Sequence, residues 1–458
     1  MNRRRRSRNG AVLIIVLVLV LLMGVAAGGF LLTMQTENIA ARSSGDLLTA
    51  QTAAESGEVM FAALLEAPRQ YRDSIGGLGD NPELFATVAV DEPRDDTDLS
   101  EMPAFTIRAP AHGARRALGR DMTSVGLGVD AADEPLVFGG VDESNKVHLM
   151  KVLQWEQTNP GAGRAALLRI PGMTEEAADS LLDWVDADSV VREFGAENEY
   201  YAAKGIRPRN GRPSSMRELL LVRGVSAETM SNWSAWLTIY SAHRDEAYDG
   251  GKRVFVNDSD LTRLHQNLVQ RVPLDWAQFV IQYRQSGPAA TASSDTPVAP
   301  ETIPLDLSLA PRFRIGSLMD LVDAKVSLNH NGSQVWVASP WSSDAVSMSE
   351  QLPQLLDRLT VTSIGRIEGA INVNVATREV LMMLPGMDEG MVERVLGARS
   401  MAGVDDPSRR TPAWLLAQDM VDRSTFRAML PHINCGGDVY RAQFWGSLGG
   451  DLATHQYE

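Results

Sequence analysis

A run of uncharged residues directly follows a short basic amino terminus, and this junction constrains the chain most. Residues 1–10 carry five arginines and end in glycine, and residues 11–34 contain no charged side chain. A helix needs roughly twenty apolar residues to cross a hydrocarbon core about 30 Å thick, so this run is long enough to span a membrane. Because arginines stay on the cytoplasmic side, we expect one membrane pass with the remainder of the chain exported.

The apolar run continues into an amphipathic stretch and shows no signal for cleavage on its far side. A secretory signal would have a shorter apolar region and a small-x-small site beyond it. Here apolar residues recur at three- and four-residue steps as far as Leu65. This spacing predicts one helix of some fifty residues, half in lipid and half amphipathic.

The leader and helix together resemble the precursors of type IV pilin-like proteins. The basic leader ends at Gly10, next to the apolar run, and Ala53–Gly57 lies on the same long helix. The resemblance implies that a prepilin peptidase cuts after Gly10 and that Ala11 becomes the new, methylated amino terminus. The alternative is a plain signal anchor in which Gly10 is incidental.

One position departs from the usual pilin pattern. The fifth residue after the expected cut is normally glutamate, whereas here it is Ile15. A carboxylate inside a bilayer is unfavourable, and pilins are taken to keep it because it pairs with the amine of the subunit above. A subunit with nothing above it has no use for that acid. The loss is typical of the K-type minor pseudopilin and indicates the tip of a filament.

Composition agrees with a large exported part and argues against nucleic acid as a partner. The 392 residues after residue 66 are enough for two or more domains. Without residues 1–10 the chain has 38 basic and 58 acidic side chains, a formal charge of −20. The single cysteine, Cys435, excludes an intramolecular disulfide, and we expect it to be a small buried side chain without a chemical role.

Three segments share the plan of a helix end, a glycine turn and a capped second helix. They are residues 168–184, 216–230 and 380–396, and the expected caps are Thr174, Ser226 and Asp388. These are helix-hairpin-helix units, and their repetition predicts a helical subdomain of sterile-alpha-motif-like type.

Such hairpins often bind DNA, so a membrane-anchored DNA-uptake receptor is the main alternative function. DNA binding there uses a Gly-x-Gly turn at a helix amino terminus, supported by basic side chains. The turns here begin at Gly172, Gly224 and Gly386, and none has the second glycine. From Arg169 to Lys204 there are nine acids and three bases. We therefore expect structural packing; an anchored scaffold that never enters a filament is a third possibility.

Acidic residues gather between the first two hairpins, and they are our candidates for metal ligands. Hard cations such as calcium take six to eight oxygen ligands, many of them from acidic loops. Acids at a helix carboxyl end are unfavourable for the helix dipole, and a cation would offset this. The spacing is not that of an EF-hand, so a solvated acidic loop stays an alternative. The candidates are Asp183, Asp186, Asp188, Glu197 and Glu199.

The order of motifs in this region resembles the K-type minor pseudopilins of the type II secretion system, the general secretion pathway protein K family. The motifs are Leu-Leu-Asp-Trp-Val-Asp-Ala-Asp, Gly-Ala-Glu-Asn-Glu-Tyr-Tyr and Ser-Met-Arg-Glu-Leu-Leu-Leu-Val-Arg-Gly-Val, followed much later by Ile-Asn-Val-Asn and Leu-Pro-Gly-Met. Matching segments cover residues 1–66, 137–240 and 365–400.

This resemblance implies an α+β fold with a pilin-like sheet body and an inserted all-α helix-hairpin-helix domain that binds calcium. The acids named above become the calcium-ligand candidates. The implied place is the cell inner membrane, with the amino terminus cytoplasmic and the carboxyl-terminal part periplasmic. The implied partners are the I-type and J-type minor pseudopilins, the major pseudopilin, the inner-membrane assembly platform and the prepilin peptidase.

The expected domain plan follows from these segments. It has a leader (1–10), the long helix (11–66), a pilin-like α+β part (67–150), the inserted helical domain (151–245), a strand and helix segment (246–285), a flexible linker (286–303) and a carboxyl-terminal α+β part with a further hairpin (304–458). Val254-Phe-Val-Asn partly repeats Ile371-Asn-Val-Asn, and the linker is rich in Pro, Ala, Ser and Thr. The segments after Arg314 and around Trp336 predict additional structured material.

No catalytic arrangement is evident. The seven histidines are scattered, and the sequence has no Gly-x-Ser-x-Gly, no His-Glu-x-x-His and no phosphate-binding loop. We therefore expect a non-enzymatic minor pseudopilin that primes or caps a filament for the export of folded proteins.

Overall fold

The computed structural model describes residues 9–91, 102–109, 137–289, 296–401, 406–448 and 453–457. It divides into two compact units. The first comprises residues 1–61, 85–107 and 443–458, and the second comprises residues 62–84 and 108–442. Helices and short strands are mixed along the chain, which confirms the predicted α+β class.

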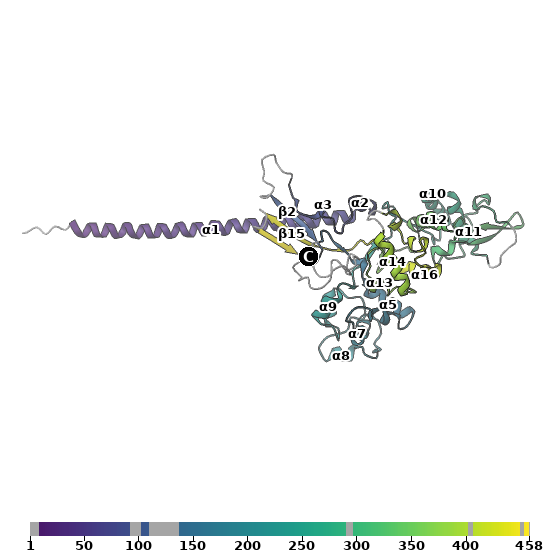
Figure 1. Ribbon diagram of the computed structural model, residues 1–458, viewed down its shortest axis with the longest axis horizontal. Coiled ribbons are helices and arrows are strands. Elements are labelled where there is room, and N and C mark those ends of the chain that lie inside the picture. Colours follow the sequence, from purple (N-terminus) through teal and green to yellow (C-terminus); the bar gives the residue numbers. More distant parts are fainter. Residues whose placement is uncertain are drawn as a thin grey trace, which may run out of the picture. The chain divides into compact units, whose positions relative to one another are not determined.

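Helix α1 (Asn9–Glu66) has 58 residues. Figure 1 shows it as one unbroken helix. Its large apolar side chains from Val12 to Met34 are exposed. Among the described residues it is the one helix long and apolar enough to cross a membrane. The predicted continuous helix is therefore confirmed. The leader up to residue 8 and the side chains of Gly10 and Ala11 lie outside the described residues.

The second half of α1 packs on the four-stranded sheet of the first unit. The strand order is β1 (Val88–Ala89), β2 (Pro103–Arg108), β15 (Gln443–Leu448) and β16 (Ala453–Tyr457). Small side chains let the helix approach closely: a Cβ at Gly57 would lie 2.8 Å from the Phe105 ring, and one at Gly446 would lie 1.8 Å from the Ala50 carbonyl oxygen. The carboxyl-terminal strands thus complete the surface on which the amino-terminal helix rests.

The second unit begins with the last turn of α1 and carries all the helical hairpins. Its first part contains α2 (Arg69–Ser74), β3 (Val141–Asp142), β4 (Val147–His148), α5 (Leu149–Thr158), α6 (Ala162–Leu167), α7 (Glu175–Val185), α8 (Asn198–Ala202), the 3₁₀ helix η5 (Met216–Leu221), α9 (Ala227–Trp233), β5 (Leu237–Thr238) and β6 (Ala242–Arg244).

Its middle part contains β7 (Val254–Phe255), α10 (Leu261–Arg271), α11 (Leu274–Ser286), η6 (Pro300–Thr302), η7 (Leu318–Leu321), β8 (Lys325–His330), β9 (Ser333–Ala338), α12 (Ala345–Arg358) and β10 (Leu359–Thr360). The last part contains β11 (Arg366–Glu368), β12 (Ile371–Asn372), α13 (Arg378–Leu381), α14 (Glu389–Met401), η8 (Pro407–Arg410), α15 (Trp414–Ala417), α16 (Arg423–Met429), η9 (Leu430–His432), β13 (Ile433–Asn434) and β14 (Tyr440–Arg441).

The hairpin helices start where the sequence predicted. The Thr174 hydroxyl accepts from the Ala177 N–H, Ser226 forms a capping box with Thr229, and the Asp388 carboxylate accepts from the Met391 N–H. Each cap satisfies an amide that has no partner within its own helix, which fixes the start of the helix.

The core of the second unit is one apolar cluster with several fully buried tryptophans, among them Trp184, Trp341 and Trp414. Cys435 belongs to this cluster, as predicted for a small buried side chain, and burial raises its pKa to about 12. Of the stretch predicted as a linker, residues 290–295 lie outside the described residues. Its far end is packed, since Pro300 and Ile303 are buried.

Candidate cation site and anchor of the long helix

Three of the predicted acids meet where α7 ends and α8 begins. Asp186 is the residue that follows α7, and Glu197 is the residue that precedes α8 and accepts from the Asn198 N–H. One carboxylate oxygen each from Asp186, Asp188 and Glu197 lies within 4.8 Å of the other two. Asp186 and Glu197 are buried and Asp188 is exposed. The two helix ends and the loop between them therefore converge on one acidic point.

Asp183 and Glu199 do not belong to this group of three. Asp183, in the last turn of α7, is fully buried and pairs with Arg192, whose Nη1 lies 2.5 Å from its Oδ1. The same Nη1 lies 2.5 Å from Asp186 Oδ2. Glu199 is exposed in the first turn of α8. Arg192 was not among the predicted site residues, although it stands in the same acidic stretch.

Gly195 allows the loop to close over Asp183. A Cβ at this position would lie 2.0 Å from Asp183 Oδ2, well inside contact distance. Asp183 Oδ2 also accepts from the Arg192 backbone N–H at 3.2 Å. The loop is thus held to the last turn of α7 both by charge and by backbone hydrogen bonding.

The arginine leaves part of the acidic charge uncompensated. Asp186 Oδ1 and Glu197 Oε1 are buried and have no hydrogen-bond partner among the described residues. Burial raises the pKa of both carboxyls, and the neighbouring acids raise that of Glu197 further. Buried carboxylate oxygens without partners are unfavourable, and a bound cation would satisfy them. The residues therefore fit a hard cation such as calcium, with backbone oxygens and waters completing its shell.

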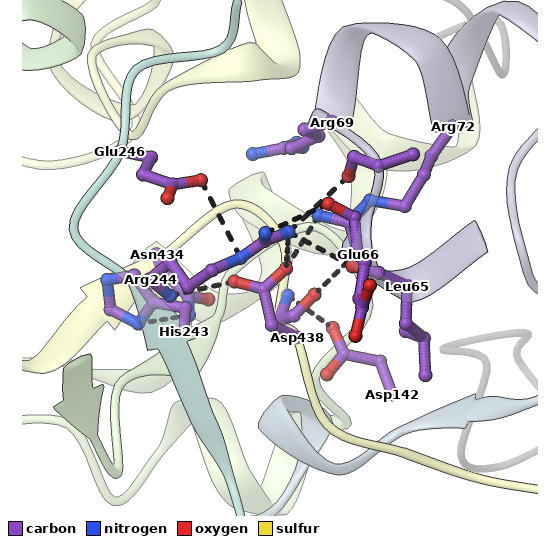
Figure 2. Close-up of polar contacts among 12 residues, drawn as sticks. Leu65, Glu66, Arg69, Arg72, Asp142, His243, Arg244, Glu246, Asn434 and Asp438 are labelled. Carbon is purple, nitrogen blue, oxygen red and sulfur yellow. Dashed lines mark hydrogen bonds and ion pairs between the residues drawn. The ribbon is translucent and has the colours of Figure 1, made fainter. Parts of the chain in front are cut away.

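A second polar cluster in this unit holds the carboxyl end of α1 (Figure 2). Arg244, at the end of β6, donates from Nη2 to the Leu65 carbonyl at 3.0 Å and from Nη1 to the Glu66 carbonyl at 3.1 Å. Its Nη2 also lies 3.4 Å from the Ala67 carbonyl oxygen. The last carbonyls of a helix have no partner in the helix and carry partial negative charge, so a guanidinium suits them. Arg244 therefore caps the long helix from a distant part of the chain.

Asp438 fixes the position of this arginine. Its Oδ2 accepts from the Arg244 backbone N–H at 2.7 Å, and its Oδ1 lies 2.6 Å from Arg72 Nη2 in α2. Burial alone would raise the pKa of Asp438, but the Arg244 N–H and the charges of Arg72 and Arg244 outweigh it, so the pKa is lowered. The ionised acid thus joins β6, α2 and the end of α1. No sequence pattern pointed to this cluster.

Comparison with known families identifies the helical region that carries the acidic group. Residues 154–242 match the model of the family described as type II secretion system (T2SS), protein K. Over this segment the chain is similar to protein K of the type II secretion system. The match confirms the resemblance predicted from the sequence, and the matched segment contains both the acidic group and Arg192. That family is a structural component of the secretion system.

The chain was also compared with curated proteins and with solved structures. No curated protein matches the chain. Among solved structures, the chain is similar to one in the crystal structure of the GspK–GspI–GspJ complex from the type 2 secretion system of enterotoxigenic Escherichia coli, with 16% sequence identity over 56% of this chain and 75% of the other. The TM-score is 0.25, and at that score the likeness carries no structural argument.

Proposed function

We propose that this protein is a minor pseudopilin at the tip of a type II secretion pseudopilus, where it primes or caps the filament that exports folded proteins. The observation that carries this proposal is α1: one helix whose first half is apolar and exposed and whose second half packs on a sheet completed by the carboxyl-terminal strands. The segment similar to protein K lies in the same chain. A helix of this kind can leave the membrane only by packing beside the helices of other subunits.

Position 15 supports placement at the tip. Ile15 is exposed in the apolar half of α1, where pilin subunits carry the glutamate that pairs with the subunit above. A subunit without that acid cannot make the pair upward, while its own amine can still receive the next subunit. The proposed partners are the I-type and J-type minor pseudopilins, which accompany GspK in the solved GspK–GspI–GspJ complex, and the major pseudopilin beneath them.

We also propose the topology and the processing of the chain. The arginine-rich leader would lie in the cytoplasm, α1 would cross the inner membrane beside the assembly platform, and the remaining residues would be periplasmic. The prepilin peptidase would cut between Gly10 and Ala11. The role is that of a structural subunit without enzymatic activity.

We propose calcium as the cofactor of the acidic group. Asp186, Asp188 and Glu197 would bind it directly, and the bound ion would tie the end of α7 to the start of α8. Its contribution would be structural, since it would compensate buried charge that Arg192 alone leaves in excess.

Mass spectrometry of the protein from membranes tests the function directly. We expect a mature chain that begins at Ala11 with a methylated amine. Gly10→Phe should leave residues 1–10 attached and keep the protein out of the filament, whereas Ser7→Ala, within the same leader, should be cut normally. An intact leader on the functional wild-type protein would refute the pseudopilin assignment and favour an anchored scaffold.

The DNA-uptake receptor is less well supported. The Gly224 turn, one of the three that could offer amides to a phosphate, is packed against α7: a Cβ there would lie 3.2 Å from the Ala177 nitrogen. None of the three turns has the second glycine, and the mature chain is strongly acidic.

A further inference from the structure

Three segments of the second unit are each closed by a parallel bridge of two residue pairs. Strand β4 pairs with β5, β7 with β10, and β12 with β13, and in all three the first residue of one strand faces the first residue of the other. The enclosed segments are residues 147–238, 254–360 and 371–434. Two of them contain the hairpins predicted from the sequence, while the middle one falls in the additional material of unassigned role.

The three segments share an order of elements, to which each adds others. The shared elements, in chain order, are the opening strand, a helical hairpin, a short helix, a residue in the left-handed conformation, another helix and the closing strand. The additions are α5 and α8 in the first segment, η6, β8 and β9 in the second, and η8 and η9 in the third. The hairpins are α6–α7, α10–α11 and α13–α14, and the short helices are η5, η7 and α15. The left-handed residues are Gly224, Asp323 and Asp419, with φ of 78°, 57° and 53°. Non-glycine residues rarely adopt this conformation, so its recurrence at one place in the order is informative.

Two side-chain contacts recur in the second and third segments. Arg284 and Arg399 both stand eleven residues after the residue that precedes their helix, α11 or α14. Arg284 Nη1 donates to the Val256 carbonyl at 2.6 Å, and Arg399 Nε donates to the Val373 carbonyl at 2.7 Å. Val256 and Val373 each directly follow the opening strand.

The residue after each of these valines is an asparagine, and both asparagines donate to a backbone carbonyl later in their segment. Asn257 Nδ2 donates to the Ile315 carbonyl at 2.9 Å, and Asn374 Nδ2 donates to the Arg409 carbonyl at 2.8 Å. Ile315 lies just before η7, and Arg409 lies in η8, the 3₁₀ helix that precedes α15. The arginine contact thus reaches the same backbone position in both segments and the asparagine contact reaches the run before the short helix, and duplication of one unit accounts for this recurrence.

The first segment differs at these positions and carries the acidic group instead. Val185 and Met150 occupy the places of the arginine and the asparagine. Where the first segment has Asp183 and Asp186, the second has Gln282 and Gln285. These amides donate to the carbonyls of Pro300 and Asp306, in the loop after α11, at 2.9 and 2.7 Å. Neutral amides thus hold the loop that follows the helix, which in the first segment is held through acids and Arg192.

The middle segment enters and leaves the fold at one point. Strands β6 and β11 are antiparallel, with Arg244 opposite Arg366, and the Asp245 N–H donates to the Gly365 carbonyl at 3.0 Å. Residues 246–364 therefore occupy the place of a hairpin turn. Hairpin turns are sites where insertion is tolerated because the two ends already lie together.

We infer that residues 246–364 contain a third copy of the segment closed by a parallel bridge, beside residues 147–238 and 371–434, that this copy is inserted at the turn between β6 and β11, and that it is held together without a cation. It packs on the last copy, since Arg423 pairs with Asp323 at 2.6 Å and Arg427 pairs with Asp320 at 2.6 Å. The cation response belongs to the first copy alone. The inference does not depend on the proposed place in a filament.

Hydrogen exchange of the full-length protein in detergent tests the equivalence of the two arginines. Arg284→Met should raise exchange about tenfold or more at residues 254–257 and 359–360 and leave 371–374 and 433–434 within about twofold. Arg399→Met should show the reverse pattern. Arg263→Met, which removes an exposed ion pair with Asp258, is the matched control and should change neither region. Equal loosening of all regions by either arginine variant, or no change, would overturn the inference.

Replacing residues 246–364 by Asn-Gly tests the point of insertion independently. Asn-Gly suits a two-residue turn between antiparallel strands. The shortened chain should melt cooperatively and at a lower temperature, because it loses the pairs to Arg423 and Arg427 and the apolar side chains, such as Trp341, that the middle segment adds to the core. It should keep the same calcium-dependent shift as the full chain. A shortened chain that does not fold would refute insertion of a separate unit. If neither chain responds to calcium, the cation proposal fails while the inserted copy stands.

Discussion

Removing the two buried acids of the cation site should abolish the response of the protein to calcium. Asp186→Asn combined with Glu197→Gln keeps the side-chain size but replaces two carboxylates, each of which has a buried oxygen without a hydrogen-bond partner among the described residues, by neutral amides. Among the described residues three carboxylates converge, and the positive charge of Arg192 lies close by. The affinity for calcium should therefore be weak for a calcium site, with a Kd of about 10⁻⁴–10⁻³ M. At about 5 mM calcium, binding to the folded form alone then adds about 1–2 kcal/mol.

The assay is thermal unfolding of the protein in calcium and in chelator. For a cooperative unit as large as the second unit, about 1–2 kcal/mol corresponds to a rise of about 1–3 °C in Tm for the wild type. Magnesium should raise Tm less, because it requires a tighter octahedral shell. The double variant should lose most of the shift, and in chelator it should melt at or above the wild type, since its amides remove buried charge.

The pH dependence provides a second check with a defined sign. Burial raises the pKa of Asp186 and of Glu197 in the folded state. Between the unfolded and folded pKa values the folded state binds more protons, so without calcium the free energy of unfolding falls as pH rises through this range. Calcium requires the ionised acids, so its stabilising effect should grow with pH over the same range.

Glu199→Gln is the matched control, because Glu199 is an exposed acid of α8 outside the group. It should keep the full calcium shift. A wild-type Tm that is the same in calcium and chelator would refute the reasoning and leave an acidic loop compensated by Arg192 alone. An equal loss of the shift in Glu199→Gln would show that the effect is general charge screening rather than a site.

Three further outcomes follow from the structure. Asp438→Asn should lower the free energy of unfolding by about 3 kcal/mol, because it leaves the buried Arg72 and the partly exposed Arg244 without their acid. Glu246→Gln should change the free energy of unfolding by less than about 1 kcal/mol, and chemical denaturation measures both variants. His148 is buried, and burial lowers its pKa to about 4. The neutral imidazole therefore adds to the free energy of unfolding in full above about pH 6.5, and this stabilisation is lost as pH falls toward 4. His148→Asn, which can still cap α5, should make the free energy of unfolding depend less on pH between about 4 and 6.5, and an unchanged pH dependence would contradict this. The protein should show no appreciable affinity for duplex DNA at physiological salt, and submicromolar binding that weakens steeply with added salt would favour the uptake receptor.

The sequence determined the features that depend on neighbouring residues. The charge boundary at Gly10 and the spacing of apolar residues predicted α1 as one helix, and Thr174, Ser226 and Asp388 predicted the starts of three helices. Caps and periodicity act over a few residues, so they are legible in the chain itself. The protein K motifs predicted the family in the same way, through short ordered runs of residues.

Only the tertiary structure decided which charges compensate one another. Asp183 and Glu199 were as good candidates as the other acids until Arg192 was seen to pair with Asp183 and Asp186, and Glu199 was seen to lie outside the group. The cap that Arg244 places on α1 joins residues nearly 180 positions apart in the chain. Pairings at such separations depend on how the chain closes on itself, and no local pattern encodes them.

The repeated segment could be predicted from the sequence only in part. The sequence showed that Val254-Phe-Val-Asn resembles Ile371-Asn-Val-Asn, but it could not show that each run opens a segment whose end returns to pair beside it. The arginine that reaches the strand comes from a helix more than twenty residues later, in a part of the copy whose sequence has diverged. A backbone carbonyl accepts from a guanidinium whatever its own side chain is, so such a contact persists after the surrounding sequence has changed.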